Sequence, residues 1–301
     1  MNADSEIKEN DLWIFDNGID ISKITTWIFD LDGVVYRGDD KIDTCIDFLH
    51  FLSNNGRKVI FYSNNSSKPS HFYADKISKM GYSVDPKDIF TSSIIAANGL
   101  KKIYTSSKNV KCFVVGELGL INSMKEVGFE VINDPPESFD YTLNIPKELI
   151  VDLVIAGVDQ YFTYHKLRWA MGLILKGANY YASNLDTTLP IGETFWPGSG
   201  AINAAITTAV GKKPQIVFGK PSPEGFEILL KTLGISKEQS IMIGDRLETD
   251  ILGAMEAQIP SILVGTGVSS LKEVLERHTT IKPSIYVKDL SKLKPYFDLN
   301  F

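Results

Sequence analysis

Short apolar runs alternate with amphipathic stretches along most of the chain, and this alternation limits the possible folds more than any other feature. Apolar runs rich in β-branched and aromatic residues predict buried strands, and stretches with apolar residues every three or four positions predict helices. Strands separated by helices favour a parallel sheet with right-handed crossovers. The chain is therefore predicted to be an α/β protein.

The predicted elements fall into two blocks. In the outer block, strands are predicted at 26–30, 58–63, 215–218, 240–243, 261–264 and 284–287, with helices at 43–52, 69–80 and 223–233. In the inner block, strands are predicted at 110–115, 149–155 and 180–183, with helices at 117–127 and 163–175, and the Pro-rich, acidic stretch 133–140 is predicted to be a solvated loop. The inner block is long enough to be a domain of its own, so we expect the chain to cross between domains near residues 93–98 and 204–214.

The overall composition bounds the possible partners and compartment. A length of 301 residues suggests about two domains. Lysine and arginine total 31 against 37 aspartate and glutamate, a formal charge of −6, which argues against nucleic-acid and anionic-membrane partners. Cys45 and Cys112 form no CxxC pair, so neither a disulfide framework nor a zinc site is indicated. With no basic-then-apolar leader and no apolar run of about 18 residues, we expect a cytoplasmic protein outside the membrane.

The densest chemical signal is the pair Asp30 and Asp32, which comes directly after an apolar strand and before Gly33. Ligands of open α/β sheets bind beyond the carboxyl ends of the strands, where both carboxylates would share one small space. Such a pair is costly unless a cation lies between the two groups or one of them is protonated, and both arrangements are useful in catalysis. The alternative is an ordinary Asp-Gly turn.

Three further strand ends carry polar residues of the same kind. The stretch that begins Ser63-Asn64 has a hydroxyl and backbone N–H groups that could bind anionic oxygens. The alternative is an ordinary Asx turn. Lys220 follows the apolar run 215–218, and it could also be a plain surface lysine. Asp245 and Asp250 follow another strand and could instead cap the next helix. Together they place acids, a hydroxyl and a lysine at one edge of one predicted sheet.

These motifs, in the order DLDGV, SNNSS, GKP and GDRLETD, resemble the four motifs of the haloacid dehalogenase (HAD) superfamily of phosphatases. Further stretches such as TWIFDLDGVVYRGD, SNLDTTLP and WPGSGAI are similar to the subgroup that contains phosphoglycolate phosphatase, pyridoxal phosphatase and 4-nitrophenylphosphatase. The resemblance implies a Rossmann-like, doubly wound parallel-sheet core with an inserted α/β cap domain of the C2 type. It would place the catalytic core at 25–96 and 207–301, the cap at 97–206, and an extension without an assigned role at 1–24.

The resemblance also implies roles for single residues. Asp30 would be the nucleophile that forms an aspartyl phosphate, and Asp32 the general acid and base, so the two carboxyl groups must hold different protonation states. Mg²⁺ would be held by the Asp30 and Asp245 carboxylates and the Asp32 backbone carbonyl, with Asp250 orienting these ligands or Lys220. Ser63, the backbone N–H of Asn64, and Lys220 would hold the phosphate oxygens. An acid at Asp32 favours phosphoester hydrolysis over dehalogenation.

Other catalytic signatures are missing from the sequence. Its four histidines are scattered and form no HExxH motif, no GxxxxGK[ST] loop occurs, and the late GTGVSS stretch is not a GxGxxG fingerprint. A zinc protease, a P-loop kinase and a dinucleotide-binding domain are therefore not indicated.

The substrate is expected to be a small-molecule phosphate ester. Leu189 lies where the resemblance puts a leucine in phosphoglycolate phosphatases and a histidine in pyridoxal phosphatases, which favours a short ester such as 2-phosphoglycolate, although Leu189 could simply pack the cap. Two alternatives remain open: a phosphotransferase or mutase on the same scaffold, and a phospho-ligand binding module without turnover. A homodimer is a further expectation from the resemblance.

Overall fold

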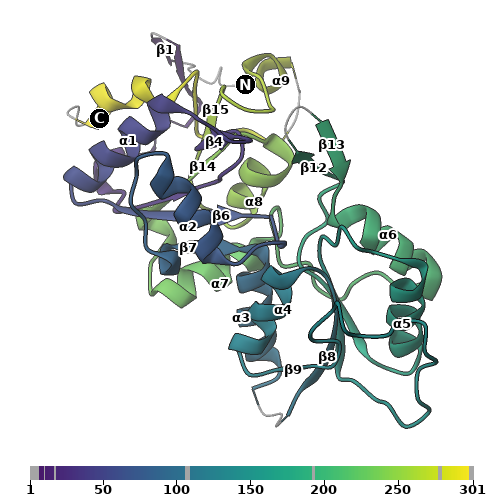
Figure 1. Cartoon of the computed structure of the whole chain (residues 1–301). Coiled ribbons are helices and arrows are strands. Elements are labelled where there is room, and N and C mark those ends of the chain that lie inside the picture. Colours follow the sequence, from purple (N-terminus) through teal and green to yellow (C-terminus); the bar gives the residue numbers. More distant parts are fainter. Residues whose placement is uncertain are drawn as a thin grey trace. The chain divides into compact units, whose positions relative to one another are not determined.

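The computed structural model describes residues 7–9, 11–16, 18–105, 109–191, 194–276 and 280–297. The chain forms two compact units, shown as a ribbon in Figure 1. Unit 1 contains the described residues of 1–63, 74–89 and 220–301, and unit 2 contains those of 64–73 and 90–219.

A mostly parallel sheet forms the centre of unit 1. Its strands lie in the order β1 (Ile7–Glu9), β2 (Leu12–Ile14), β16 (Ile285–Val287), β15 (Ser261–Val264), β14 (Ser240–Gly244), β3 (Thr26–Phe29) and β6 (Lys58–Ser63). The five strands from β16 to β6 are parallel, and β1 and β2 add an antiparallel edge. Every residue of β3 and β14 is buried, as expected for strands covered on both faces. The prediction of an α/β fold with a parallel sheet is confirmed.

Unit 1 also contains helices, short helical turns and one β-hairpin. They are α1 (Asp43–Asn54), α7 (Pro223–Leu233), α8 (Leu252–Glu256), α9 (Leu271–Glu276), the 3-10 turns η1 (Ile21–Lys23), η2 (Pro86–Asp88), η3 (Lys237–Gln239) and η5 (Leu290–Phe297), the π-helical turn η4 (Leu247–Ile251) and the hairpin of β4 (Tyr36–Arg37) and β5 (Asp40–Lys41). α7 begins at Pro223, whose missing N–H is not needed in a first helical turn. Two elements span the boundary of the units: α2 (Ser70–Lys79) and β7 (Ile89–Thr91).

Aromatic packing joins α1 to the sheet and to the C-terminal turn η5. The ring of Trp27 on β3 lies edge-on to Phe48 of α1, with centroids 5.5 Å apart, and stacks on Phe297 of η5 at 5.2 Å. Trp27 and Phe48 are fully buried, and burying a side chain of this size stabilises the fold by about 1.5–3 kcal/mol. This cluster helps to hold β3, the strand that leads into Asp30.

The segment before residue 25 takes part in the sheet. β2 pairs with β16 in antiparallel register, with Ile14 opposite Ile285, and Leu12 is buried. The sequence leaves residues 1–24 without an assigned role; the described part of this segment extends the sheet at its edge. A three-residue strand is too short to carry a clear period-2 pattern, which is why the sequence does not reveal it.

Unit 2 has its own parallel sheet, in the order β11 (Asn179–Ala182), β10 (Leu153–Ala156), β8 (Lys111–Val115) and β9 (Glu130–Val131). Its helices are α3 (Ser92–Ile103), α4 (Leu118–Glu126), α5 (Tyr164–Leu175) and α6 (Ser199–Val210), and β12 (Thr188–Ile191) forms a hairpin with β13 (Thr194–Pro197). Phe113 of β8 stacks on Trp169 of α5 in the core of this unit. The predicted inner α/β block therefore has its own core.

Two details of the predicted elements are wrong. Residues 215–218 form no regular strand: Val217 makes an isolated bridge with Ala182, and the segment lies in unit 2 beside β11. The strand predicted at 149–155 begins only at Leu153, because Leu149 closes a turn onto the carbonyl of Pro146. A short apolar run does not show whether its backbone pairs with a neighbouring strand along its whole length.

The loop at 133–140 is anchored rather than fully solvated. Asn133 is completely buried; its Oδ1 accepts a hydrogen bond of 3.0 Å from the backbone N–H of Val114, and its Nδ2 donates one of 2.8 Å to the Val114 carbonyl. Phe139 packs against Trp169, with ring centroids 4.9 Å apart. The buried side-chain amide of Asn133 thus makes hydrogen bonds to β8 of the kind that the backbone of a neighbouring strand would make.

The chain passes from one compact unit to the other at 63/64, 73/74, 89/90 and 219/220. The predicted crossings lie elsewhere, and α3 and α6 run without interruption through 93–98 and 204–210. The division into a core at 25–96 and 207–301, a cap at 97–206 and an extension at 1–24 stays a prediction.

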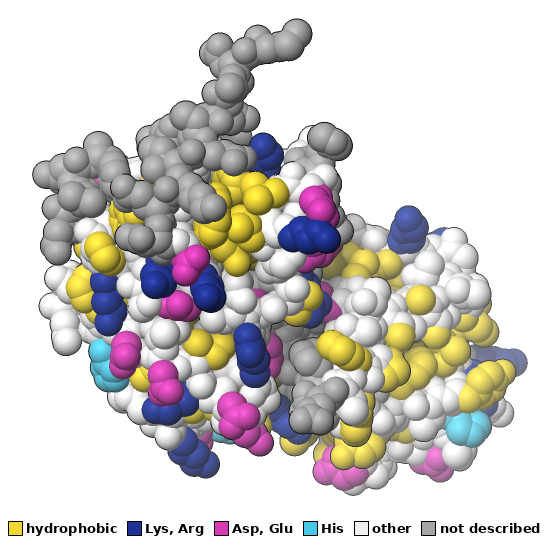
Figure 2. All heavy atoms as spheres, turned by 90° about the horizontal axis from the view of Figure 1, so that it is seen from above, with side chains coloured by type: hydrophobic (Ala, Val, Ile, Leu, Met, Phe, Trp, Pro, Cys, Tyr) yellow, Lys and Arg dark blue, Asp and Glu magenta, His cyan; other side chains and the backbone are white. Residues whose placement is uncertain are grey.

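The surface charges are mixed in sign on one face of the molecule (Figure 2). On the face drawn in Figure 2, the described lysine and arginine side chains are interspersed with aspartate and glutamate instead of gathering in one basic patch. Of the helices in the described ranges, none combines the length and apolar composition needed to cross a membrane.

Candidate active site

A buried lysine joins two of the predicted site carboxylates in unit 1. The Nζ atom of Lys220 lies 2.6 Å from Oδ1 of Asp30 and 2.6 Å from Oδ1 of Asp250, and it donates a hydrogen bond of 2.9 Å to the carbonyl of Tyr62. Asp30 follows β3 directly, and Tyr62 belongs to the neighbouring strand β6. Only 2% of Lys220 is exposed. The reading of Lys220 as an ordinary surface lysine is therefore wrong.

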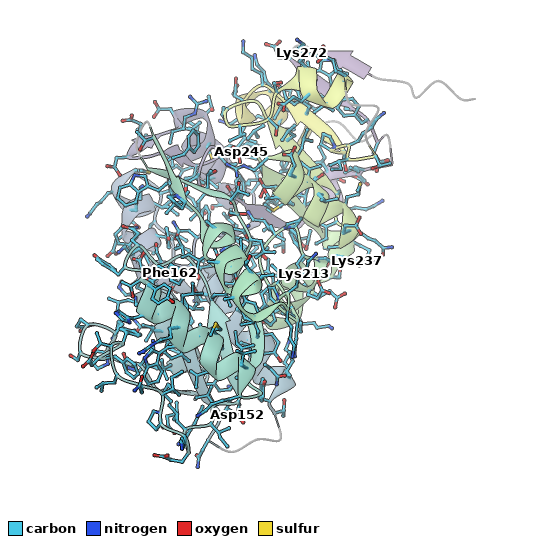
Figure 3. The ribbon with its side chains drawn as sticks, turned by 90° about the vertical axis from the view of Figure 1, so that its right-hand side faces the viewer. Asp152, Phe162, Lys213, Lys237, Asp245 and Lys272 are labelled. Carbon is cyan, nitrogen blue, oxygen red and sulfur yellow. The ribbon has the colours of Figure 1, made fainter. Side chains whose placement is uncertain are left out.

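Asp245, labelled in Figure 3, follows β14 and is held by backbone N–H groups. Its Oδ2 accepts a hydrogen bond of 2.8 Å from the N–H of Val268. Asp250 supports the same turn, because its Oδ2 accepts from the N–H groups of Asp245 and Arg246 at 3.2 and 3.1 Å. Asp250 is thus both a partner of Lys220 and a support for the turn at Asp245. The positioning role that the resemblance implies for Asp250 stays a prediction.

Two glycines make room for the Asp245 carboxylate. Gly33 has a φ of +84°, and a Cβ at either Gly33 or Gly267 would overlap Oδ2 of Asp245. The N–H of Gly33 donates to the carbonyl of Tyr36 at 2.7 Å, which closes the turn after Asp32. Glycine is required here for the conformation and for the space. The sequence identifies Gly33 as the turn residue, but it misses Gly267 and Val268, because the GTG stretch only shows that a tight loop follows a strand.

Asp32 lies in this turn next to the β4–β5 hairpin. An isolated bridge links Asp32 to Tyr36. Lys76 of α2 holds the hairpin by donating a hydrogen bond of 2.6 Å to the carbonyl of Gly38, and its ammonium lies 4.1 Å from the centre of the Tyr36 ring. Burial raises the pKa of Asp32 to about 6, although the charges of Lys76 and Arg246 oppose this shift. A carboxyl group with such a pKa can give up and take back a proton near neutral pH.

The other site carboxyls are also shifted. Burial raises the pKa of Asp30 well above its usual range, against the lowering effect of Lys220 and with further raising by Asp250 and Asp245. Burial and the charge of Asp250 raise the pKa of Asp245 to about 7. The pKa of Lys220 is raised, because Asp250 and Asp30 outweigh the opposing effect of its burial. The lysine thus stays charged, and the carboxylates crowd negative charge into one place.

This crowding fits a divalent cation. Oxygens of Asp30, Asp245 and Asp250 lie within 4.8 Å of one another, and no other acidic group of this kind occurs among the described residues. Carboxylate oxygens are the hard ligands that Mg²⁺ and Ca²⁺ prefer, and a cation would offset the charge repulsion that adds to the effect of burial on these pKa values. The ligand set implied by the resemblance shares Asp30 and Asp245 with this group. Its third member is the backbone carbonyl of Asp32, whereas the third carboxylate here is that of Asp250.

The remaining predicted residues lie in different places. Ser63 ends β6 and is buried, one residue after the Tyr62 carbonyl that Lys220 binds. Asn64 and Leu189 belong to unit 2. Leu189 is half-buried on β12, opposite Trp196 of β13. The structure thus brings Asp30, Asp245, Asp250 and Lys220 together within unit 1. Ser63 ends β6 of the same sheet, and Asp32 lies in the turn that follows β3.

Comparison with known protein families identifies the relatives of this chain. The model of haloacid dehalogenase-like hydrolases matches residues 27–130, and a second model of HAD-like hydrolases matches residues 217–293. The chain is 33% identical to 4-nitrophenylphosphatase of Schizosaccharomyces pombe, across 91% of this chain and 94% of that protein. It is 32% identical to the chloroplastic phosphoglycolate phosphatase 1A of Arabidopsis thaliana, across 90% of this chain and 76% of that protein.

Solved structures show the same relationship. The 4-nitrophenylphosphatase of Thermotoga maritima matches with a TM-score of 0.80 and 30% identity, covering 92% of this chain and 99% of that one. A glycerol phosphate phosphatase of Mycobacterium tuberculosis, solved in complex with magnesium, matches with a TM-score of 0.78 and 27% identity, covering 91% and 77%. The chain therefore belongs to the haloacid dehalogenase-like hydrolases, as a phosphoric monoester hydrolase of that family.

Proposed function

We propose that this protein is a Mg²⁺-dependent phosphatase that hydrolyses a short phosphate monoester through an aspartyl phosphate on Asp30. The observation that carries the proposal is the buried contact of Asp30 with Lys220, in a cluster that also holds Asp245 and Asp250. Asp30, Asp245 and the Asp32 carbonyl would hold the ion, which supplies charge neutralisation at the transferring phosphoryl group.

In the first step, a carboxylate oxygen of Asp30 attacks phosphorus as the bond from phosphorus to the ester oxygen breaks. The leaving alkoxide takes a proton from Asp32, whose pKa of about 6 leaves a usable protonated fraction near neutral pH. Lys220 stabilises the negative charge that gathers on the phosphoryl oxygens, together with the Ser63 hydroxyl and the N–H of Asn64.

In the second step, Asp32 accepts a proton from water, and the water oxygen attacks the phosphorus of the aspartyl phosphate. The bond from phosphorus to Asp30 breaks, which returns the carboxylate and releases inorganic phosphate. Asp32 is protonated again, so the cycle is closed without any other reactant.

The substrate class rests on Leu189 and on the relatives. Leu189 is an apolar residue at a position where the resemblance puts leucine in enzymes for phosphoglycolate, and one relative is named for that substrate. An apolar side chain offers no hydrogen bond to a large polar leaving group, which favours a short ester such as 2-phosphoglycolate.

The test is a substrate panel. Phosphate release is measured from 2-phosphoglycolate, pyridoxal 5′-phosphate, AMP and 4-nitrophenyl phosphate, each with Mg²⁺ and with EDTA. We expect Mg²⁺-dependent release, with the highest kcat/KM for 2-phosphoglycolate. Faster turnover of pyridoxal 5′-phosphate or AMP would remove the substrate assignment. Activity that survives EDTA would remove the metal, and transfer of the phosphoryl group to an added sugar in place of water would favour a phosphotransferase.

A further inference from the structure

A polar cluster in unit 2 surrounds the residue that follows Ser63. The carbonyl of Asn64 accepts hydrogen bonds from Asn184 Nδ2 at 2.7 Å and from the Ser92 hydroxyl at 2.6 Å. The side chain of Asn64 donates from Nδ2 to Oδ1 of Asp186 at 2.9 Å. Asn64 and Asn184 are 8% and 3% exposed, so these bonds form away from bulk water, where their loss is costly. The loop 183–187 therefore binds both the backbone carbonyl and the side chain of Asn64.

That loop is itself fixed at the start of α6. The N–H of Asp186 donates to Asn184 Oδ1 at 3.1 Å, and the Asp186 carbonyl accepts from the N–H of Gly200 at 2.8 Å. The hydroxyl of Ser199 donates to the Asn184 carbonyl at 2.9 Å. The acceptor offered to Asn64 is thus carried by a loop bonded at several points.

The same loop also contacts the residue that precedes Lys220. The N–H of Gly219 donates to the carbonyl of Ser183 at 2.6 Å. A Cβ at Gly219 would lie 2.7 Å from both Asn184 Cβ and Asn64 Oδ1, so only glycine lets the chain pass here. The loop 183–187 therefore holds the neighbours of both Ser63 and Lys220.

We propose that Asp186 is a positioning residue for phosphate binding, acting through Asn64 and supported by Asn184. Asp186 fixes the side chain of Asn64, and Asn184 fixes its carbonyl. Together they hold Asn64 in place, and with it the backbone N–H that is to bind a phosphate oxygen. The inference rests on the proposed function, because it assumes that Asn64 receives the phosphoryl group.

A positioning role for Asp186 predicts a specific kinetic pattern. The phosphoryl group is common to every substrate, so removing the Asp186 carboxylate should lower kcat/KM by the same factor for 4-nitrophenyl phosphate and 2-phosphoglycolate. It should also weaken inhibition by inorganic phosphate. A residue that contacts the leaving group would instead change the substrates unequally.

The experiment compares Asp186→Ala with Asp186→Asn. Alanine removes the acceptor, and we expect kcat/KM to fall about 10-fold or more for both substrates, within the range of a hydrogen bond to a charged group. Asparagine keeps an oxygen acceptor, and we expect kcat/KM to stay within about threefold of the unmodified protein. The inhibition constant of inorganic phosphate should rise in the alanine variant alone.

A charge exchange tests the contact if the alanine variant folds poorly. Asn64→Asp places a carboxylate against Asp186, and adding Asp186→Asn restores a donor for it. We expect the double variant to be at least about 10 times more active than Asn64→Asp alone. Asn133→Ala is the matched control, because it removes buried amide bonds to Val114 in the same unit without touching Asn64. It should lower the melting temperature and leave the phosphate inhibition constant unchanged.

Equal activity of Asp186→Ala and the unmodified protein would overturn the proposal, as would a loss confined to one substrate or no recovery in the double variant. A chain without Mg²⁺-dependent hydrolysis in any form would instead contradict the proposed function itself. The two failures are therefore distinct.

Discussion

Oδ1 of Asp250 lies 2.6 Å from Nζ of Lys220, and both side chains are 2% exposed. The same nitrogen lies 2.6 Å from Asp30, so one ammonium faces the carboxylates of Asp30, Asp250 and the nearby Asp245. When all are ionised, three negative charges and one positive charge leave two negative charges. A divalent cation balances this remainder, which connects the geometry of Lys220 to the proposed metal.

Replacing Lys220 by methionine should destabilise the protein and nearly abolish activity. The change leaves Asp30 and Asp250 buried without their counter-charge, and breaking a buried pair in this way costs about 3–5 kcal/mol. We expect the free energy of unfolding in denaturant, measured in EDTA, to fall by about this amount. Adding Asp250→Asn to Lys220→Met should recover part of it.

The matched control is Lys231→Met. Lys231 pairs with Glu227 at 3.6 Å, but both side chains are largely exposed, and such pairs contribute about 0–1 kcal/mol. If Lys220→Met were as stable as Lys231→Met, the buried ion pair would not support the structure as described.

Gly33→Ala should lower both Mg²⁺ affinity and activity. The new Cβ would overlap the Asp245 carboxylate, in addition to the strain of the φ of +84°. Gly56→Ala separates the two effects, because Gly56 has a φ of +69° but nothing within 4 Å of its Cβ position. Both variants should lose about 1 kcal/mol of stability from strain. Only Gly33→Ala should lose activity, by about 100-fold, because it displaces a site carboxylate. Equal activities would show that the Asp245 contact is unimportant.

Mg²⁺ binding should weaken as the pH falls. In the metal-free protein, burial and Asp250 raise the pKa of Asp245 to about 7. The ion binds the ionised carboxylate, so protons compete with it below pH 7 and are released when it binds. Between pH 8 and pH 6 the affinity should fall about 10-fold, as measured by calorimetry. An affinity that is constant over this range would contradict the raised pKa.

The same shift has an effect on stability, and its sign follows from proton binding. A carboxyl group whose pKa is higher in the folded state than in the unfolded chain binds more protons when folded. The stability that Asp245 contributes is therefore complete below pH 4 or so and is lost as the pH rises through about 7. In EDTA, the contribution of Asp245 to the free energy of unfolding should therefore decrease between pH 5 and pH 8. With Mg²⁺ bound, this decrease should disappear.

The parts of the site that the sequence predicts well are those at strand ends. Asp30 and Asp245 each follow a buried, continuous apolar run, and parallel strands bring such ends to the same edge. Lys220 follows a run that is not a regular strand, yet its side chain still meets Asp30, because the loop rather than the strand carries it there.

The parts that the sequence misses depend on tertiary contacts. Nothing in the local pattern around Gly267 or Val268 shows that this loop holds Asp245, and nothing around Asp186 shows that its carboxylate meets Asn64. The changes between the two compact units likewise fall at places that the local pattern does not mark, and α3 and α6 continue through 93–98 and 204–210. Period and propensity describe a segment's own structure but not its partners.

The most direct test of the account is to capture the covalent intermediate. The protein is mixed with Mg²⁺ and 4-nitrophenyl phosphate, quenched in acid during turnover and digested, and the peptide that contains Asp30 is analysed by mass spectrometry. We predict a phosphoryl group on Asp30, and for Asp30→Asn neither this adduct nor more than about one thousandth of the activity. Undiminished turnover by Asp30→Asn, or a phosphoryl group on another residue during turnover, would contradict the account.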